Sequence, residues 1–199
     1  MAREYGEWVM PAHRIDKVTS GALALAKRPE VHADLARQFN RRTVDKEYLV
    51  LTRSRGLAAS GAIDLPLSIG RKSRIRVAAA RDNITEHDGS WSIPDEHVFS
   101  EVRTYPSRTL FRKLWEGERH TLLVARPVTG RRHQIRVHLA WIGHPIEGDP
   151  LFDRSSAARG ARTALHSWRI AFDAEWSDGS RQRAIAAPPR DFWEPVRQE

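Results

Sequence analysis

The sequence PAHRIDKVTSGALALAK, residues 11–27, decides the fold. Its first part, residues 11–21, carries an acid, two cations, a histidine and two hydroxyl groups, and it ends at a glycine. Its second part, residues 22–27, alternates small and large apolar side chains, which predicts a buried strand. Polar groups on a loop that a core strand holds in place are typical of an active site. The same residues would also suit a surface turn with ordinary capping groups, so the stretch alone leaves both interpretations open.

The composition favours a basic protein that binds nucleic acid. The chain has 199 residues, enough for one domain with a real core, and we expect a single domain over residues 1–199. Its 33 Lys and Arg against 25 Asp and Glu give a net charge of +8. Arginine outnumbers lysine, and guanidinium groups bind phosphate bidentately and stack on bases. A basic but merely solvated surface is the alternative.

Other classes of protein are disfavoured. The absence of cysteine excludes disulfides, thiolate metal sites and a cysteine nucleophile. No apolar run approaches the roughly 18 residues that a membrane span needs, and the first residues lack the apolar core of a secretory signal. We expect no membrane contact, and nothing in the sequence argues against the cytoplasm, where we expect the protein to be a monomer.

Hydrophobic periodicity predicts a mixture of helices and strands without repeating β-α units. We expect helices over residues 29–41 and 131–142, strands over 44–52, 97–114, 120–128 and 164–172, a β-rich excursion over 53–80, turns over 81–94 and 116–119, and a polar loop over 154–162. This order predicts an α+β fold whose mixed, largely antiparallel central sheet is flanked by helices.

The helix over residues 29–41 has a clear apolar face. Val31, Leu35, Ala36 and Phe39 share one side at helical spacing, whereas Asp34, Arg37 and Gln38 are expected to face solvent. The helix over 131–142 is expected to end at Gly143 and to hold Arg131 and Arg132 in its first turn.

Two motifs resemble those of the RluA-type RNA pseudouridine synthases. The segment HRIDKVTSG, residues 13–21, resembles that family's H-R-L-D-x-x-T-S-G, and TGRRHQIRVHL, residues 129–139, resembles its T-G-R-x-H-Q-I-R-V-H-L. The pairs GHPI (143–146) and GDPL (148–151) match as well, and so does the K-x-Y of residues 46–48. The family normally has a preceding segment with an early strand, which this chain is expected to lack.

The resemblance implies an enzyme that isomerises a specific uridine of rRNA or tRNA to pseudouridine, without cofactor or metal. It implies that Asp16 is the catalytic aspartate, that Tyr48 stacks on the target base, and that Arg136 pairs with Asp16. Arg14 would fill the gap that the flipped base leaves. Lys17, Lys46, Arg131 and Arg132 would contact the RNA, and Leu165 would close the apolar wall.

The residues themselves agree with this chemistry but leave alternatives open. Asp16 lies between Arg14 and Lys17, which favour its ionised form, and an ionised carboxylate can be a nucleophile. It has no nearby carboxylate in the sequence, which disfavours a two-carboxylate glycosidase. Without the resemblance, a tyrosine such as Tyr48 within a strand would be read as a core residue.

The sequence contains no motif for binding a metal or a nucleotide cofactor. His133 and His138 are five positions apart, which would place them on different sides of a helix, and no His-Glu-x-x-His frame is present. Walker and dinucleotide glycine motifs are also missing. The sequence leaves two rivals: a non-catalytic RNA-binding protein on the same fold, and a hydrolase that uses Asp16 and His133. The cationic run over residues 71–76 is expected to be exposed and to contact RNA backbone.

Overall fold

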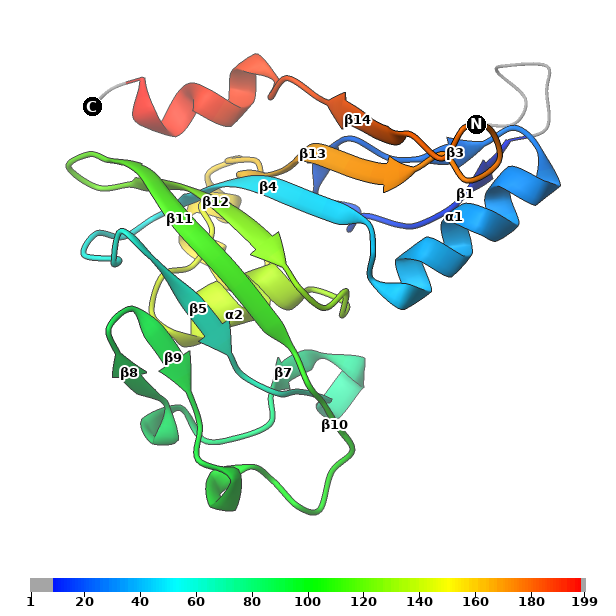
Figure 1. The fold of residues 1–199 in the computed structure, drawn as a ribbon. Coiled ribbons are helices and arrows are strands. Elements are labelled where there is room, and N and C mark those ends of the chain that lie inside the picture. The colour runs from blue at the N-terminus through cyan, green and yellow to red at the C-terminus, as the bar shows by residue number, and fades with distance from the viewer. Residues whose placement is uncertain (1–8, 198–199) are drawn as a thin grey trace.

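In the computed structural model, which describes residues 9–197, one long twisted sheet carries most of the strands (Figure 1). Nine strands of the described residues form it. In spatial order, the strands along its main path are β14 (Arg181–Ile185), β13 (Leu165–Asp173), β4 (Asp45–Thr52), β12 (Thr121–Pro127), β11 (Arg108–Glu116), β5 (Ser60–Asp64), β9 (Ser90–Ser92) and β8 (Thr85–His87). The ninth, β2 (Ser20–Gly21), pairs with β13.

The sheet is mixed and largely antiparallel. Only the β2–β13 and β5–β9 pairs are parallel among the pairings of this sheet in the described chain. Two smaller sheets accompany it: β1 (Met10–Pro11) with β3 (Leu25–Ala26), and β10 (Thr104–Tyr105) with β6 (Leu67–Ile69) and β7 (Ile75–Val77). The predicted α+β class is confirmed.

The helices are few and short. They are α1 (Pro29–Arg41), α2 (Gln134–Trp141) and α3 (Arg154–Ala158), with single 3-10 turns η1 (Arg71–Ser73), η2 (Arg81–Asn83) and η3 (Asp95–His97) and a longer 3-10 segment η4 (Arg190–Val196). Within residues 9–197, none of them is both long and apolar enough to cross a bilayer. The expectation about a missing preceding segment concerns the start of the chain and lies outside the described residues.

Strand β4 lies at the centre because it is apolar on both faces. Leu49, Val50 and Leu51 are 4%, 0% and 0% exposed, and β4 pairs with β13 on one side and β12 on the other. A run that is apolar at consecutive positions is typical of a strand whose two faces are both covered. The first half of β4, including Tyr48, is less deeply buried and lies at the rim of the core.

Helix α1 has the predicted bounds, but its polar face was predicted wrongly. Asp34 and Gln38 are 5% and 2% exposed rather than solvent-facing. Gln38 donates from Nε2 to the Asp173 carbonyl at 2.7 Å, and its Oε1 accepts from the Asp173 backbone N–H at 3.0 Å. These partners lie 135 positions away, so helical periodicity alone could not reveal them.

Helix α2 begins later than predicted and is buried on every side. It starts at Gln134 because His133 adopts a left-handed backbone with φ 56°, and Arg131 and Arg132 therefore precede the helix. All residues from Gln134 to Ala140 are buried, so its polar side chains must find partners inside the protein. Gly143, with φ 89°, follows its C-terminal end as expected.

Three further predictions were wrong. The expected strand over residues 22–27 is reduced to the pair Leu25–Ala26, and Leu25 is 37% exposed. The turn-rich window 81–94 contains the hairpin β8–β9, which reverses at Asp88 and Gly89 with φ 48° and 75°. An Asp-Gly pair is a strong hairpin signal, so this one was available in the sequence. The polar loop 154–162 contains α3.

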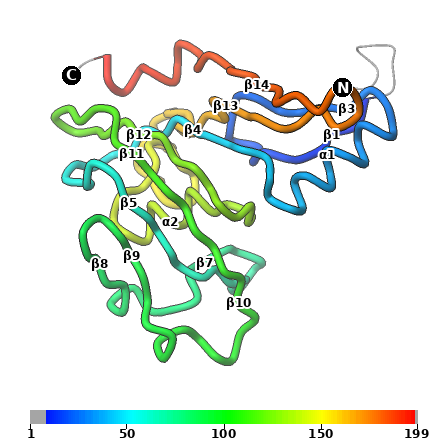
Figure 2. The backbone as a smooth tube through the Cα atoms, in the orientation of Figure 1, coloured from blue at the N-terminus to red at the C-terminus, as the bar shows by residue number. Residues whose placement is uncertain are grey.

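The chain path brings distant segments together at one end of the sheet. Parallel pairing joins Ser20 to His166, although 146 positions separate them, and Figure 2 shows the blue N-terminal segment beside the orange β13. The loop that precedes β2 therefore lies near β4, β13 and the start of α2.

Candidate active site

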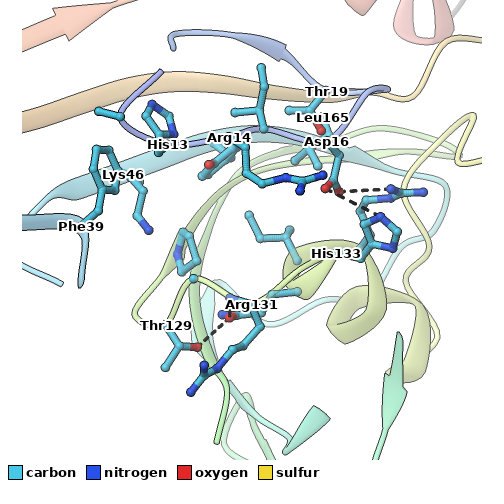
Figure 3. A pocket seen from close by; sticks show the side chains of 18 of the residues that line it. His13, Arg14, Asp16, Thr19, Phe39, Lys46, Thr129, Arg131, His133 and Leu165 are labelled. Atoms are coloured by element: carbon cyan, nitrogen blue, oxygen red, sulfur yellow. Dashed lines mark hydrogen bonds and ion pairs between the residues drawn. The ribbon is translucent and has the colours of Figure 1, made fainter. Parts of the chain in front are cut away.

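A cavity of about 310 Å³ lies where these segments meet. Its walls come from the loop 12–16, the first half of β4, the segment 127–131 that follows β12, and the first turn of α2 (Figure 3). This volume falls at the lower end of the range for small-ligand pockets. Segments that are remote in sequence therefore contribute to one hollow.

At the inner end of this cavity, the Arg136 guanidinium bridges two carboxylates. Its Nη1 lies 3.1 Å from Oδ2 of Asp16, while its Nε and Nη2 donate to the two Asp149 oxygens at 2.7 and 2.9 Å. Burial alone would lower the pKa of Arg136, but Asp149 and then Asp16 raise it above its usual value. Arg136 and Asp149 are 3% and 0% exposed, whereas the Asp16 side chain is 18% exposed. Asp16 is thus the member of the trio that faces the cavity.

His133 approaches the same carboxylate. Its Nε2 lies 3.7 Å from Oδ1 of Asp16. Burial lowers the pKa of His133 below its ordinary value, Asp16 opposes this, and Arg136 and Arg132 lower the pKa further. The imidazole is therefore neutral near pH 7 and does not act as a second cation beside Asp16.

Tyr48 lines the cavity from β4. It stands opposite Ala125 of β12 and Ser167 of β13. Burial raises the pKa of Tyr48 to about 12, a hydrogen bond with Ser167 opposes the shift, and the charge of Asp16 adds to it. The phenol keeps its proton at neutral pH, so the residue offers the cavity a ring and a neutral hydroxyl rather than a phenolate.

A buried chain of hydrogen bonds holds the segment before α2. Oγ1 of Thr129 donates to Oε1 of Gln134 at 2.6 Å, and Nε2 of Gln134 donates to Oγ1 of Thr109 at 3.1 Å. Thr109 donates to Nδ1 of His138 at 2.9 Å, and the opposite ring nitrogen of His138 donates to the Leu65 carbonyl at 3.0 Å. The bond from Thr109 to Nδ1 needs a neutral imidazole, so protonation of His138 would break this link of the chain.

We expect His138 to make the fold sensitive to acid. Burial lowers the pKa of His138 from 6.5 to about 4, although its bond to Leu65 opposes the shift. Between these values the unfolded chain binds a proton that the folded chain does not, so acidification favours unfolding. We predict that His138 contributes a loss of about 3 kcal/mol between pH 7 and pH 4.

This is measured by urea unfolding of wild type and His138→Gln at several pH values. The variant should be less stable at pH 7, and the two curves should converge towards pH 4. His87→Gln, at a side chain that is 91% exposed, is the matched control and should follow wild type throughout. A constant gap between wild type and His138→Gln would contradict the prediction.

Seven of the nine residues predicted from the sequence line this one cavity, and two do not. Those that line it are Asp16, Tyr48, Arg136, Arg14, Lys46, Arg131 and Leu165. Figure 3 shows the Arg14 side chain extending towards Asp16. Lys17 instead lines a neighbouring hollow of about 470 Å³, and Arg132 lines a groove that shares His133 with the cavity. The left-handed turn at His133 accompanies this separation of Arg132 from its neighbour Arg131.

The two cations on the outer wall are each placed near a ring. Nζ of Lys46 lies 6.0 Å from the centre of Phe39, and burial, followed by the charge of Arg42, lowers the pKa of Lys46. The Arg131 guanidinium lies 5.4 Å from the centre of Tyr105. Both groups line the cavity and bring positive charge to it.

Two more residues shape the site, and sequence reasoning missed the role of the first. Asp149 belongs to a matched segment, GDPL, but nothing in the sequence indicated that it pairs with Arg136. His13 accepts from the Ala24 N–H at 3.0 Å and stacks on Phe39 at 4.4 Å between ring centres. Burial and then Lys46 lower the pKa of His13 to about 4, so His13 fixes the loop as a neutral hydrogen-bond acceptor.

The arrangement is suited to chemistry at a neutral ligand with a polar ring. It combines a cavity-facing carboxylate, a guanidinium that fixes the rotamer of that carboxylate, and an aromatic wall. No group of three or more histidine and acidic side chains within residues 9–197 is arranged to hold a metal ion.

Comparison with known proteins identifies the type of domain. The family model described as RNA pseudouridylate synthase matches residues 2–141. A ribosomal large subunit pseudouridine synthase D from Nitrosomonas europaea is 37% identical over 166 residues, which are 79% of this chain and 42% of that protein. A ribosomal large subunit pseudouridine synthase C from Haemophilus ducreyi is 34% identical over 182 residues, 88% of this chain and 50% of that protein.

Two further comparisons agree. A dual-specificity RNA pseudouridine synthase RluA from Vibrio vulnificus is 29% identical over 86% of this chain and 63% of its own length. The solved structure of human RNA pseudouridylate synthase domain containing 4 superposes with a TM-score of 0.76 at 21% identity, covering 98% of this chain and 80% of that one. The chain spans about half the length of the curated relatives that it matches.

Proposed function

The chain belongs to the RNA pseudouridylate synthase family, and from this premise we propose that residues 1–199 form one catalytic domain that converts uridine in RNA to pseudouridine. The observation that carries the proposal is the Asp16 carboxylate, held at 3.1 Å by Arg136 and facing a cavity beside a tyrosine ring. Relatives named for the ribosomal large subunit and for dual RNA specificity support rRNA or tRNA as the substrate.

The reaction rearranges bonds without a net change of oxidation state. The bond from the ribose C1′ to N1 of uracil breaks, the base rotates, and a bond from C1′ to C5 forms. The C5 proton leaves to solvent, and N1 takes up a proton from solvent. Asp16 serves either as the nucleophile at C1′ or as a base at the sugar, and both roles need a carboxylate aimed at the ribose. No cofactor is required by this balance.

The remaining cavity residues receive the base. A uridine must leave the stacked RNA to reach Asp16, and its ring would then pack between Tyr48 and Leu165. Arg14, an exposed side chain that extends towards Asp16, would take the place of the flipped base in the stack. Lys46 and Arg131, each beside a ring, would meet phosphates, with Lys17 and Arg132 further along the RNA. An enzyme with these substrates is expected in the cytoplasm, as a monomer.

Release of tritium from RNA labelled at C5 of uridine tests the proposal. Transcripts of rRNA and tRNA are incubated with the purified protein, and released tritium is followed to its plateau. We expect release of about one equivalent per modified site from at least one RNA, with pseudouridine at a defined position. Tight RNA binding without tritium release would favour the non-catalytic alternative, and free uracil as product would favour a hydrolase.

We predict that Tyr48 contributes to turnover through its ring and not through its hydroxyl. Because the raised pKa keeps the phenol protonated, Tyr48→Phe should keep turnover within about tenfold of wild type, whereas Tyr48→Ala should lose about 100-fold or more. Tyr105→Phe, outside the cavity lining, serves as the matched control. A Tyr48→Phe enzyme as inactive as Tyr48→Ala would show that the hydroxyl takes part in proton transfer.

A further inference from the structure

A second hollow adjoins the catalytic cavity. It is a groove of about 550 Å³, and His133 lines both it and the cavity that contains Asp16. One wall is the turn between β6 and β7, residues 70–76, and the other is formed by Arg132, the end of α2 and the turn at 151–152. The groove therefore begins where the catalytic cavity ends.

Cations dominate the rim of this groove. The cations that line it are Arg71, Lys72, Arg74, Arg76 and Arg132, and all but Arg76 are exposed. None of the ion pairs found within residues 9–197 involves any of these five side chains.

Several arginines elsewhere on the surface do have a carboxylate partner. Arg126 and Arg181, for example, lie 2.7 and 2.6 Å from the carboxylate of Asp45. Five cations collected around one hollow without a carboxylate create a positive potential that attracts a polyanion.

The floor of the groove is apolar. It contains Trp141, Leu151 and Phe152, with the Trp141 and Phe152 rings edge to face at 6.1 Å. Leu151 is 37% exposed. A phosphate ion has no apolar surface to pack on such a floor. A nucleotide has both a phosphate for the rim and a base or ribose for the floor.

Two contacts fix the shape of the cationic wall. The Gly70 N–H donates to the Arg74 carbonyl at 2.7 Å and closes the turn, while Nη2 of Arg132 donates to the Ser73 carbonyl at 3.0 Å and joins it to the opposite wall. The wall is therefore held in place before any ligand arrives, which lowers the ordering cost of binding.

We propose that this groove binds a single-stranded segment of the substrate RNA that flanks the target uridine. Phosphates lie on the rim formed by residues 71–76 and Arg132, and an unstacked base or ribose packs on Trp141 and Leu151. The inference rests on the proposed function, because continuity with the catalytic cavity identifies the occupant. A single strand fits better than a duplex, since a duplex offers its phosphates but keeps its base faces stacked.

The first experiment measures binding of a single-stranded decamer of uridine by fluorescence anisotropy at several salt concentrations. Arg71→Gln/Lys72→Gln/Arg74→Gln should raise the dissociation constant about 30-fold at 0.1 M salt. It should also lower the slope of log affinity against log salt by about 2, because each lost phosphate contact accounts for about 0.7 on a single strand. The matched control, Arg154→Gln/Arg183→Gln/Arg190→Gln, removes the same charge outside the groove and should change affinity less than about threefold.

The second experiment tests the apolar floor. Leu151→Glu introduces a carboxylate at a position that is already 37% exposed, so the fold should tolerate it. Affinity for the decamer should fall about tenfold. Leu114→Glu, at a position that is 40% exposed outside the groove, should leave affinity unchanged. Binding of a pre-formed RNA duplex should respond to the rim variant but not to Leu151→Glu.

The outcomes separate this proposal from the proposed function. Equal losses of affinity in the rim variant and in its distant control would mean that the groove acts only through non-specific charge, and would overturn the proposal. An unchanged affinity in Leu151→Glu would mean that no base or ribose packs on the apolar floor, and would also overturn the proposal. Neither result would affect the proposed function if the wild-type enzyme releases tritium. Conversely, if the wild-type protein releases no tritium but the groove variants bind RNA more weakly as expected, only the proposed isomerase activity would be rejected.

Discussion

Asp16→Asn is expected to abolish tritium release, with a loss of about 1,000-fold or more, while the protein folds and binds RNA. The reason is chemical rather than structural. An amide has nearly the same shape as the carboxylate and can still accept a hydrogen bond from Arg136, but it is neither a nucleophile nor a base. The second partner of Arg136, Asp149, remains in place at 2.7 and 2.9 Å, so the guanidinium does not lose its buried counter-charge.

The measurement combines tritium release with circular dichroism and RNA binding. Asp95→Asn removes an exposed carboxylate outside the cavity and should match wild type in all three. Asp16→Glu separates charge from position, because it keeps the carboxylate but moves it by one methylene, and it should lose at least about 100-fold. Tritium release near the wild-type rate in Asp16→Asn would remove Asp16 from the chemistry.

The second large effect is expected at Arg136. Arg136→Lys keeps a cation but loses the planar fork that serves Asp149 and Asp16 together. Turnover should fall by about 100-fold or more, because the Asp16 carboxylate is no longer fixed towards the ribose. Since Arg136 is 3% exposed, affinity for RNA should stay within about threefold. Equal losses of turnover and of affinity would indicate that Arg136 is a phosphate contact.

Substitution of Arg136 should also lower the stability of the fold, and this effect can be measured separately from the loss of turnover. Arg136→Ala would leave Asp149 buried without a counter-charge, which costs about 3–5 kcal/mol, and Arg136→Lys should cost less. Urea unfolding measures both. Arg126→Lys is the matched control, because that arginine pairs with Asp45 at 2.7 Å on the surface, where an exchange should cost under about 1 kcal/mol.

The fold could be predicted where local pattern and tertiary environment agree. Helix α1 has the predicted bounds because its apolar spacing and its first-turn proline act locally. Strand β4 was predictable because a consecutive apolar run suits a central strand. The burial of Asp34 and Gln38 could not be predicted. Gln38 bonds to Asp173, which is 135 positions away in the sequence, and Asp34 pairs with Arg37.

The site shows the same limit more sharply. Two motifs in order predicted the contact between Asp16 and Arg136, which are 120 positions apart. The order of the motifs does not show where each side chain points. It therefore could not reveal that Lys17 and Arg132, both expected to contact RNA, lie outside the lining of the cavity. Asp149 was missed for the complementary reason, because a buried carboxylate within a turn reads as an ordinary capping group until its partner is known.

The bridge from Asp149 through Arg136 to Asp16 has a consequence for the evolution of this fold. Because Asp149 satisfies the guanidinium by itself, position 16 can change without unfolding the protein, whereas positions 136 and 149 constrain one another. A single base change at codon 16 would then yield a stable descendant that still holds RNA but no longer edits it.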